Sequence, residues 1–496
     1  MEQPHQEPLG VGRLISVARA AGHRAEVMFF TDPRQALRHA VSARPDVLAY
    51  STMTGAHRMY LGLNREIKKH IPAFSIFGGP HPTYSPDMVG EPGVDGVCRG
   101  EGETALPLLL DALAHGGGAH LATPNFWFNH GGEVVKNDPA PLIVDLDTLP
   151  FADRASFYQI PTLRDSHLKS FMTTRGCPYN CTYCFNHQYN ALYRGLGPIV
   201  RQRSVDNVIS EALEVMEKYP LGMIQFMDDI FINSPAWVEE FSEKFPARVG
   251  VPFFCNVRAE LVTPEIVRDL KRAGCWSVCV GIETGDEDLR RRMLGRLQTN
   301  EHIREAIRLF RANRIKVMTT NMVGIPGGSF ESDWKTYRLN AECRVDYPWV
   351  SITYPYPGTR IHELAQEQGW AVPRGDELSH SYFNEMPFET PDKNRVENLH
   401  RLLALMADKP ALEPLFKLLI RSRGKLPRAL YTLIFGFWKL YCYETRIFKN
   451  PGALWLFGSG ALPRFTGNAA LGLRMMFPGK TRPGPDHDKT SKSSLS

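Results

Sequence analysis

Three cysteines lie within eight residues of one another, in the segment "TTRGCPYNCTYCFNH" at residues 173–187. Cys177, Cys181 and Cys184 have the spacing C-x3-C-x2-C. Thiolates are soft ligands that suit zinc, copper(I) and iron–sulfur clusters. Three thiolates can hold three corners of a cubane cluster and leave one iron open to a ligand from outside the protein. A zinc site would need a fourth ligand, for which His187 is the nearest candidate.

The composition limits the classes of protein to consider. The chain has 496 residues, 43% of them apolar, which is enough for two or three domains with their own cores. The net charge of +5 is mild and gives no argument for a nucleic-acid partner. Nine cysteines and no visible secretory signal argue against a disulfide scaffold and for a metal role of the tight cluster. Because no secretory signal is visible, we expect a cytoplasmic protein. No uncharged apolar run is long enough to span a bilayer, so we expect no spanning helix.

The cysteines need a scaffold, and strands alternate with helical patterns from residue 169 onward. The predicted strands are "SFMTTRG", "GMIQFMDD", "PFFCNVRAE", "WSVCVGIE", "VMTTNMVGIP" and "WVSITYPYPGT". Six strand–helix repeats predict a partial (β/α)6 barrel, whose chemistry gathers at the C-terminal ends of its strands. The cysteines follow the first of these strands.

Polar and glycine residues follow the next strands of the predicted barrel. Asp228 and Asp229 end the second strand, Arg258 the third and Glu283 the fourth, and "VGIPGGS" (323–329) follows the fifth. An acidic pair at a strand end can bind a cofactor or a substrate, or simply be solvated. The glycines form either a plain turn or a place where a ligand comes close to the backbone.

The first ~115 residues also alternate strands with helices. The predicted strands are "HRAEVMFF" (23–30), "PDVLAYS" (45–51), "FSIFGG" (74–79) and "VDGVCRG" (94–100). Such alternation predicts a doubly wound parallel sheet, in which ligands bind beyond the carboxyl ends of the strands. These ends read "STMTG", "GGPHPT" and "RGEGE", and each is also compatible with an ordinary turn.

The segment "CPYNCTYC" resembles the C-x3-C-x-aromatic-C signature of the radical S-adenosylmethionine (SAM) enzymes. The resemblance implies a [4Fe–4S] cluster on Cys177, Cys181 and Cys184, with SAM on the fourth iron and reductive cleavage to a 5′-deoxyadenosyl radical. It names no catalytic acid or base. The SAM contacts that it implies are Tyr183 and the glycine motif of Gly324 and Gly327 beside the adenine, Asp228 and Asp229 for the amino group, Arg258 for the carboxylate, and Glu283 for ribose hydroxyls or an ammonium.

The leading domain resembles the cobalamin-binding domain of one subclass of these enzymes, through "PLGVGRLISVARAAGH", "GGPHPT" and "CRGEGE". The Asp-x-His-x-x-Gly motif that lends a histidine to cobalt is absent. The candidates for the pocket of the cobalamin nucleotide tail are Ser51, Thr54, Gly78, Gly79 and His81, with His81 also considered as an axial ligand. The chain begins just after the strand with which such domains open. We therefore expect residues 23–30 to pair directly with 45–51 or to be poorly ordered, and cobalamin to bind weakly.

The sequence after residue ~365 predicts helices without strands. Residues 417–449 hold eight basic residues and one acid among apolar ones. This pattern predicts an amphipathic helix that lies on a membrane surface or covers a hydrophobic substrate, or one that packs on the barrel with its basic side chains outward. The predicted domains are a cobalamin-binding-like domain (1–115), a linker with a hairpin (116–168), the barrel (169–365), a helical region (366–477) and a disordered tail (478–496).

The resemblance implies a cobalamin-dependent radical methyltransferase that acts on an unactivated carbon of a small-molecule or lipid-like substrate. It would use the cluster, SAM, cobalamin and an electron donor such as flavodoxin or ferredoxin, and no nucleic acid. One alternative keeps the cofactors but is an oxidative cyclase or rearrangement enzyme without methyl transfer. Another alternative is a non-enzymatic zinc- or cluster-binding module.

Overall fold

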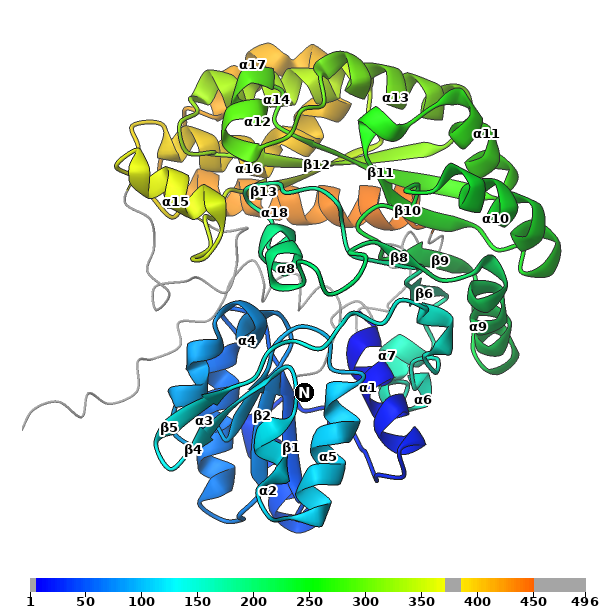
Figure 1. Cartoon of the computed structure of the whole chain (residues 1–496). Coiled ribbons are helices and arrows are strands. Elements are labelled where there is room, and N and C mark those ends of the chain that lie inside the picture. The colour runs from blue at the N-terminus through cyan, green and yellow to red at the C-terminus, as the bar shows by residue number, and fades with distance from the viewer. Residues whose placement is uncertain (1–5, 371–384, 450–496) are drawn as a thin grey trace, which may run out of the picture.

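The computed structural model describes residues 6–370 and 385–449 and forms two lobes (Figure 1). The N-terminal lobe contains a five-stranded sheet in the order β1-β2-β3-β4-β5. The second lobe contains a six-stranded sheet in the order β13-β12-β11-β10-β9-β6. The predicted fold class, a doubly wound domain followed by a partial barrel and a helical region, is confirmed.

The parallel part of the N-terminal sheet is apolar on both faces. Phe77 and Val97 lie in one buried cluster with Leu61, and the neighbouring Ile76 packs on the other face with Leu109. Side chains alternate between the faces of a strand, so helices must cover both sides. The strands are β1 (Val47–Ser51), β2 (Phe74–Gly78) and β3 (Gly96–Cys98), and the helices are α1 (Leu9–Ala20), α2 (Pro33–Ala43), α3 (His57–Lys68), α4 (Pro80–Tyr84) and α5 (Ala105–His115).

The hairpin expected in the linker belongs to this sheet. Strands β4 (Phe126–His130) and β5 (Glu133–Lys136) are antiparallel, and β4 pairs antiparallel with β3. Gly131 and Gly132 form the tight turn, both with positive φ, as a two-residue hairpin turn of this kind requires. Short helices α6 (Arg154–Phe157) and α7 (Pro161–Arg164) then lead to the barrel.

Residues 23–30 do not form the strand that the sequence predicts. Among the described residues, β1 pairs in register with β2 alone, and only Phe30 of the predicted strand forms an isolated bridge. Phe30 is held by side-chain packing instead, edge-on to Tyr60 with ring centroids 6.2 Å apart. The expectation that this segment pairs along 45–51 is therefore wrong. A cavity of about 1350 Å³ extends along the free side of β1, between α1, α2 and residues 23–28.

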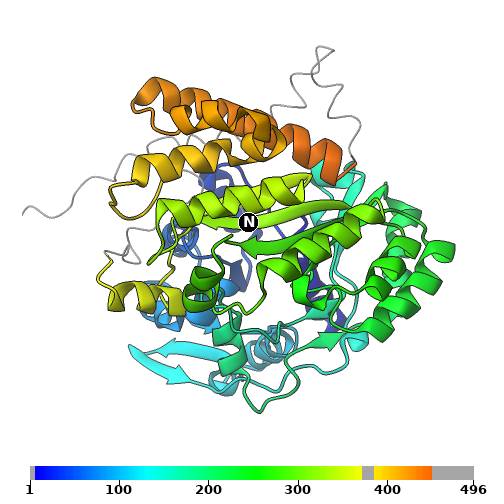
Figure 2. The same ribbon diagram turned by 90° about the horizontal axis from the view of Figure 1, so that it is seen from above.

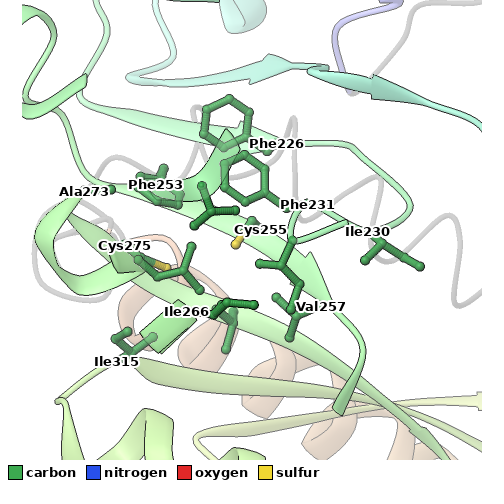
Figure 3. Close-up of a cluster of buried hydrophobic side chains, with 14 of the residues drawn as sticks. Phe226, Ile230, Phe231, Phe253, Cys255, Val257, Ile266, Ala273, Cys275 and Ile315 are labelled. Carbon is green, nitrogen blue, oxygen red and sulfur yellow. The ribbon is translucent and has the colours of Figure 1, made fainter. Parts of the chain in front are cut away.

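The barrel sheet is parallel throughout and carries its main core on its outer face. Figure 3 shows Phe226, Phe253 and Cys255 of the strands meeting Phe231 and Ile266 from the covering segments. The strands are β6 (Leu168–Phe171), β9 (Met223–Phe226), β10 (Phe253–Val257), β11 (Cys275–Glu283), β12 (Lys316–Val323) and β13 (Tyr347–Ile352). The helices around them are α9 (Val205–Lys218), α10 (Pro235–Arg248), α11 (Pro264–Arg272), α12 (Glu287–Leu294), α13 (Asn300–Ala312), α14 (Phe330–Cys343) and α15 (Arg360–Glu367).

The C-terminal helices, orange in Figure 2, stack against one side of the barrel. They are α16 (Lys393–Asp408), α17 (Glu413–Leu419) and α18 (Lys425–Tyr441), followed by a π-helical turn at Cys442–Ile447. Cys442 and Ile447 pack against Phe254 and Met318 on the inner face of the sheet. Residues 450–477 of the predicted helical region and the predicted disordered tail lie outside the described residues.

No helix within residues 6–370 and 385–449 is both long and apolar enough to cross a bilayer.

Helix α8 (Asn186–Leu192) lies between the two lobes (Figure 1). Tyr193, just after it, accepts a hydrogen bond at its hydroxyl from the backbone N–H of Glu101 (2.8 Å). A Cβ atom added to Gly100 would lie only 1.9 Å from that hydroxyl. The lobes therefore meet without space for a side chain at residue 100.

We predict that Gly100→Ala destabilises the protein much more than Gly118→Ala. Both glycines have a φ of +79°, so backbone strain lowers the stability of either alanine variant by about 1 kcal/mol. A Cβ at Gly118 has no heavy atom within 4 Å, whereas at Gly100 it overlaps Tyr193. Thermal unfolding of the two variants checks the prediction, and equal melting temperatures would contradict the tight junction.

Candidate functional site

The cysteine loop connects the short strand β7 (Thr174–Arg175) with α8. Cys177 and Cys181 are buried and Cys184 is half-buried. Gly176 precedes them with a φ of +82°, and a Cβ there would lie 2.1 Å from the carbonyl oxygen of Ile199, so only glycine fits. The pKa of Cys184 is raised to about 11, first by burial and further by the nearby Asp229, Cys181 and Cys177. The three thiols therefore lie close enough to influence one another.

The number and type of these donors are those that an iron–sulfur cluster needs. In the described part of the chain, no three His, Cys, Asp or Glu side chains gather closely enough to hold one ion. The Nδ1 of His187, the candidate fourth zinc ligand, lies 2.5 Å from the carbonyl oxygen of Cys184. Three soft donors are what a [4Fe–4S] cluster with one open iron requires.

Arg258 lies beside the cysteines. Its guanidinium is 3.5 Å from the centre of the Tyr179 ring, and its Nη1 is 3.6 Å from Sγ of Cys181. Its Nε donates to Glu260 (2.8 Å), which is only partly exposed. The positive charge of Arg258 therefore lies directly beside the second cysteine of the motif. The predicted contact of Arg258 with the SAM carboxylate stays a prediction.

Glu283 is the centre of a buried polar network at the end of β11. Its Oε1 accepts hydrogen bonds from Arg296 Nη1 (2.9 Å), the Tyr183 hydroxyl (3.1 Å) and the Thr320 hydroxyl (3.2 Å). Glu283 and Arg296 are both buried, and Glu283 has a φ of +64°, which is unusual for a residue with a side chain. The structure thus joins Tyr183 and Glu283, two predicted site residues, directly, and Arg296 also donates to the Tyr183 hydroxyl (2.9 Å).

Arg296 was not predicted as a site residue, because it lies in "GRLQTN", after α12 and away from any strand end. Its guanidinium also donates to the carbonyl oxygen of Gly281 (3.1 Å). Arg296 reaches the end of β11 only in the folded chain, so its position in the sequence gives no sign of this contact.

The two aspartates after β9 differ in their surroundings. Oδ1 of Asp228 accepts bonds from the backbone N–H and hydroxyl of Thr173 (2.9 and 2.8 Å) and from the N–H of Thr174. Burial raises the pKa of Asp228 to about 6. Its other oxygen, Oδ2, is buried without a hydrogen-bond partner in the described residues. Asp229 accepts a bond from Asn186 (3.1 Å) and lines the large cavity. Asp228 therefore anchors the start of the cysteine loop, and Asp229 faces open space.

The glycine motif after β12 lies beside Tyr183. Ile325 belongs to the same apolar cluster as Leu289 and Met293, against which Tyr183 packs. The backbone N–H of Gly324 donates to the carboxylate of Asp333 (3.1 Å), whose pKa burial raises to about 8. Gly324 and Gly327 both have positive φ values, so the turn needs glycine there.

The cavity beside β1 extends to the carboxyl ends of both parallel sheets. Ser51, Gly78 and Gly79 line it from the N-terminal lobe, and Met227 and Asp229 line it from the barrel. A Cβ on Gly79, with a φ of +92°, would lie 3.1 Å from the Ser51 hydroxyl. The strand ends of the two lobes thus face one shared space.

Thr54 and His81 are not among the residues that line this cavity. The Thr54 hydroxyl lies 3.1 Å from Nδ1 of His81, and the His81 ring stacks on His57 with centroids 3.7 Å apart. Burial, followed by the charge of His57, lowers the pKa of His81 to about 4. His81 is therefore a neutral ring at pH 7.

A charge cluster ties the cysteine loop to the N-terminal lobe. Arg175, two residues before Cys177, pairs with Glu103 (2.5 Å) and Glu101 (3.3 Å). Arg201 pairs with the same Glu101 (2.7 Å). Both glutamates come from "CRGEGE", one of the segments that resemble the cobalamin-binding domain, and neither glutamate was predicted to contact the cysteine loop. The charge cluster of Glu101, Glu103, Arg175 and Arg201 fixes the loop relative to the ends of β1–β3.

We predict that Glu283→Gln lowers stability before any cofactor is added, because it leaves the buried Arg296 guanidinium without its counter-charge. Breaking a buried ion pair on one side costs about 3–5 kcal/mol. Denaturant unfolding of the cofactor-free protein measures this loss. The double variant E283Q/R296M should recover part of it, since no charge is then stranded. A loss in the double variant equal to the sum of both single losses would contradict the coupling.

Two family models match the sequence. The Radical SAM superfamily model matches residues 171–339, and the B12 binding domain model matches residues 4–110. The curated relatives include an uncharacterized methyltransferase of Pyrococcus horikoshii, 26% identical over 72% of this chain and 78% of its own. They also include the anaerobic magnesium-protoporphyrin IX monomethyl ester cyclase of Rubrivivax gelatinosus, 24% identical over 80% of this chain and 72% of its own.

A solved structure shares the arrangement of the two lobes. The radical SAM methyltransferase TsrM of Kitasatospora setae, with cobalamin and a [4Fe–4S] cluster bound, superposes with a TM-score of 0.61. The match covers 74% of this chain and 73% of the other at 18% identity. At this identity the likeness establishes a common fold.

Proposed function

Because the chain belongs to the radical SAM enzymes that carry a B12-binding domain, we propose that it is a cobalamin-dependent radical methyltransferase acting on an unactivated carbon of a small-molecule or lipid-like substrate. The observation that carries this proposal is the shared cavity, onto which the carboxyl ends of both parallel sheets open. When bound, the cluster with SAM supplies a carbon radical, and the cobalamin supplies a methyl group.

The proposed cofactor-binding residues form three sets, one each for the cluster, SAM and cobalamin. Cys177, Cys181 and Cys184 hold the cluster, with Arg258 balancing its negative charge. The SAM set is Tyr183, Asp228, Asp229, Glu283, Gly324 and Gly327. The cobalamin set is Ser51, Gly78 and Gly79, which line the cavity, while Thr54 and His81 remain predicted contacts without a place in its lining.

The chain's own residues contribute placement. The charge cluster holds the cysteine loop against the N-terminal lobe, and Asp228 fixes the backbone where the loop begins. A one-electron donor such as flavodoxin or ferredoxin is the proposed protein partner.

An oxidative cyclase without methyl transfer is the second candidate function. Its support is the similarity to the ester cyclase of Rubrivivax gelatinosus over most of this chain. The two candidates use the same cofactors and differ in whether the methyl group reaches the product.

We predict that replacing Cys177, Cys181 or Cys184 by Ala abolishes cluster assembly and 5′-deoxyadenosine formation, since each removes one of three ligands. Anaerobic reconstitution, iron and sulfide analysis and the cluster absorbance measure the first effect. The matched control is Cys343→Ala on α14, which should assemble a full cluster. A full cluster in the triple variant C177A/C181A/C184A would end the radical interpretation.

We predict that a strain with the gene transfers an intact trideuteromethyl group to a metabolite or lipid when grown on methyl-deuterated methionine. A deletion strain and a strain with C181A should both lack the labelled compound. Mass spectrometry of extracts from the three strains identifies the product. A product that depends on the gene but carries no label would favour the cyclase.

A further inference from the structure

Helix α18 is apolar on two opposite faces. Tyr431 and Phe435 are buried on one face, where α18 packs on α16. The opposite face exposes Leu426 (83%), Leu430 (53%), Leu433 (57%) and Phe437 (51%). At 100° per residue these four side chains fall within an arc of about 60°. We call this set the leucine stripe. Its regular spacing distinguishes it from scattered surface leucines, which are common on proteins.

Basic residues gather at the N-terminal end of the stripe. Arg421, Arg423 and Lys425 are exposed, and none of them forms an ion pair with a residue of the described ranges. Arg428, one turn into the helix, pairs with Glu385 (2.5 Å). We call Arg421, Arg423, Lys425 and Arg428 the basic end. It carries a local excess of positive charge beside exposed apolar side chains.

The basic end contains a small polar cavity of about 260 Å³. Arg421 and Arg423 line it together with Arg395, Asn394 and Pro391. Arg395 also pairs with Asp392 (2.7 Å), which neutralises one of the three guanidiniums. Two uncompensated guanidiniums in one concave site suit a phosphate group, which arginine binds through paired hydrogen bonds.

We propose that the leucine stripe and the basic end form one docking surface for a bilayer with anionic phospholipid headgroups. The charge decides between occupants. Exposed leucines alone would also suit a second copy of the chain, whereas a cluster of unpaired cations at their end calls for an anionic partner. An amphipathic helix of this kind lies in the plane of the interface, with leucines in the acyl boundary and cations at the phosphates.

The same helix connects this surface to the barrel. Its C-terminal continuation, Cys442 and Ile447, packs on the inner face of the sheet, and Lys439 lies 4.3 Å from the ring centre of Trp349 on β13. Docking through α18 therefore places the barrel directly against the bilayer. The docking proposal does not depend on methyl transfer, and an apolar substrate would gain a short route from lipid to protein.

Vesicle flotation of the full-length, anaerobically reconstituted protein tests the proposal. We expect it to float with vesicles of phosphatidylcholine and phosphatidylglycerol and to stay at the bottom with phosphatidylcholine alone. The variant L426E/L433E should lose binding at least about tenfold, because two leucines no longer enter the acyl region. The variant R421Q/R423Q should also bind about tenfold or more weakly, and high salt should weaken the unmodified protein in the same way.

Matched controls separate docking from general surface changes. L213E/M216E changes two exposed apolar residues of α9 in the same manner, and R34Q/R38Q removes two exposed arginines of α2. Both should float like the unmodified chain, with equal iron content and circular dichroism. Equal binding to neutral and anionic vesicles, or no binding to either, would overturn the proposal. So would a dimer in size-exclusion chromatography that L426E/L433E dissolves, because the stripe would then bind a second copy.

Discussion

Parallel strands all end on the same edge of their sheet, and this chain uses that constraint twice. The carboxyl ends of β1 and β2 face the carboxyl ends of β6 and β9 across one cavity. Hydrogen-bonded ladders fix the register of these strands, and with it the positions of their ends. Groups carried by the two sheets can therefore be brought together without any long mobile arm. The cysteine loop, the aspartates after β9 and the glycines after β2 all take their positions from this geometry.

Much of the scaffold is readable from the sequence, since buried parallel strands are continuous apolar runs separated by amphipathic helices. All six barrel strands overlap the runs that predict them, although the end of the first run, Thr174–Arg175, leaves the sheet as β7. Residues 23–30 are the exception, because an apolar extended run reads the same whether its backbone pairs or its side chains pack. Phe30 against Tyr60 is such a side-chain contact. Whether a segment joins a sheet depends on which backbone lies beside it in the fold, and a single sequence does not specify that neighbour.

The site shows the same division between local and distant information. Three cysteines in eight residues are a local pattern, so the sequence alone identifies them as candidate cluster ligands. Arg296 does not, because its partners Glu283 and Tyr183 are 13 and 113 residues away in the chain. Asp228 was singled out for its strand end, yet its Oδ1 is committed to the backbone of Thr173 and Thr174. Residue type and position predict where chemistry gathers, and only packing assigns each group its partner.

The charge cluster limits which leading lobe can pack against this barrel. Glu101 and Glu103 come from one lobe, and Arg175 and Arg201 come from the other. Exchanging the leading lobe for one from a relative would leave two arginines without counter-charges beside the cysteine loop, unless all four residues were inherited together. A chimera of this barrel with another leading lobe therefore needs acidic residues at the positions of Glu101 and Glu103. The two lobes are separate segments of the sequence, but the charge cluster makes their contact depend on residues from both.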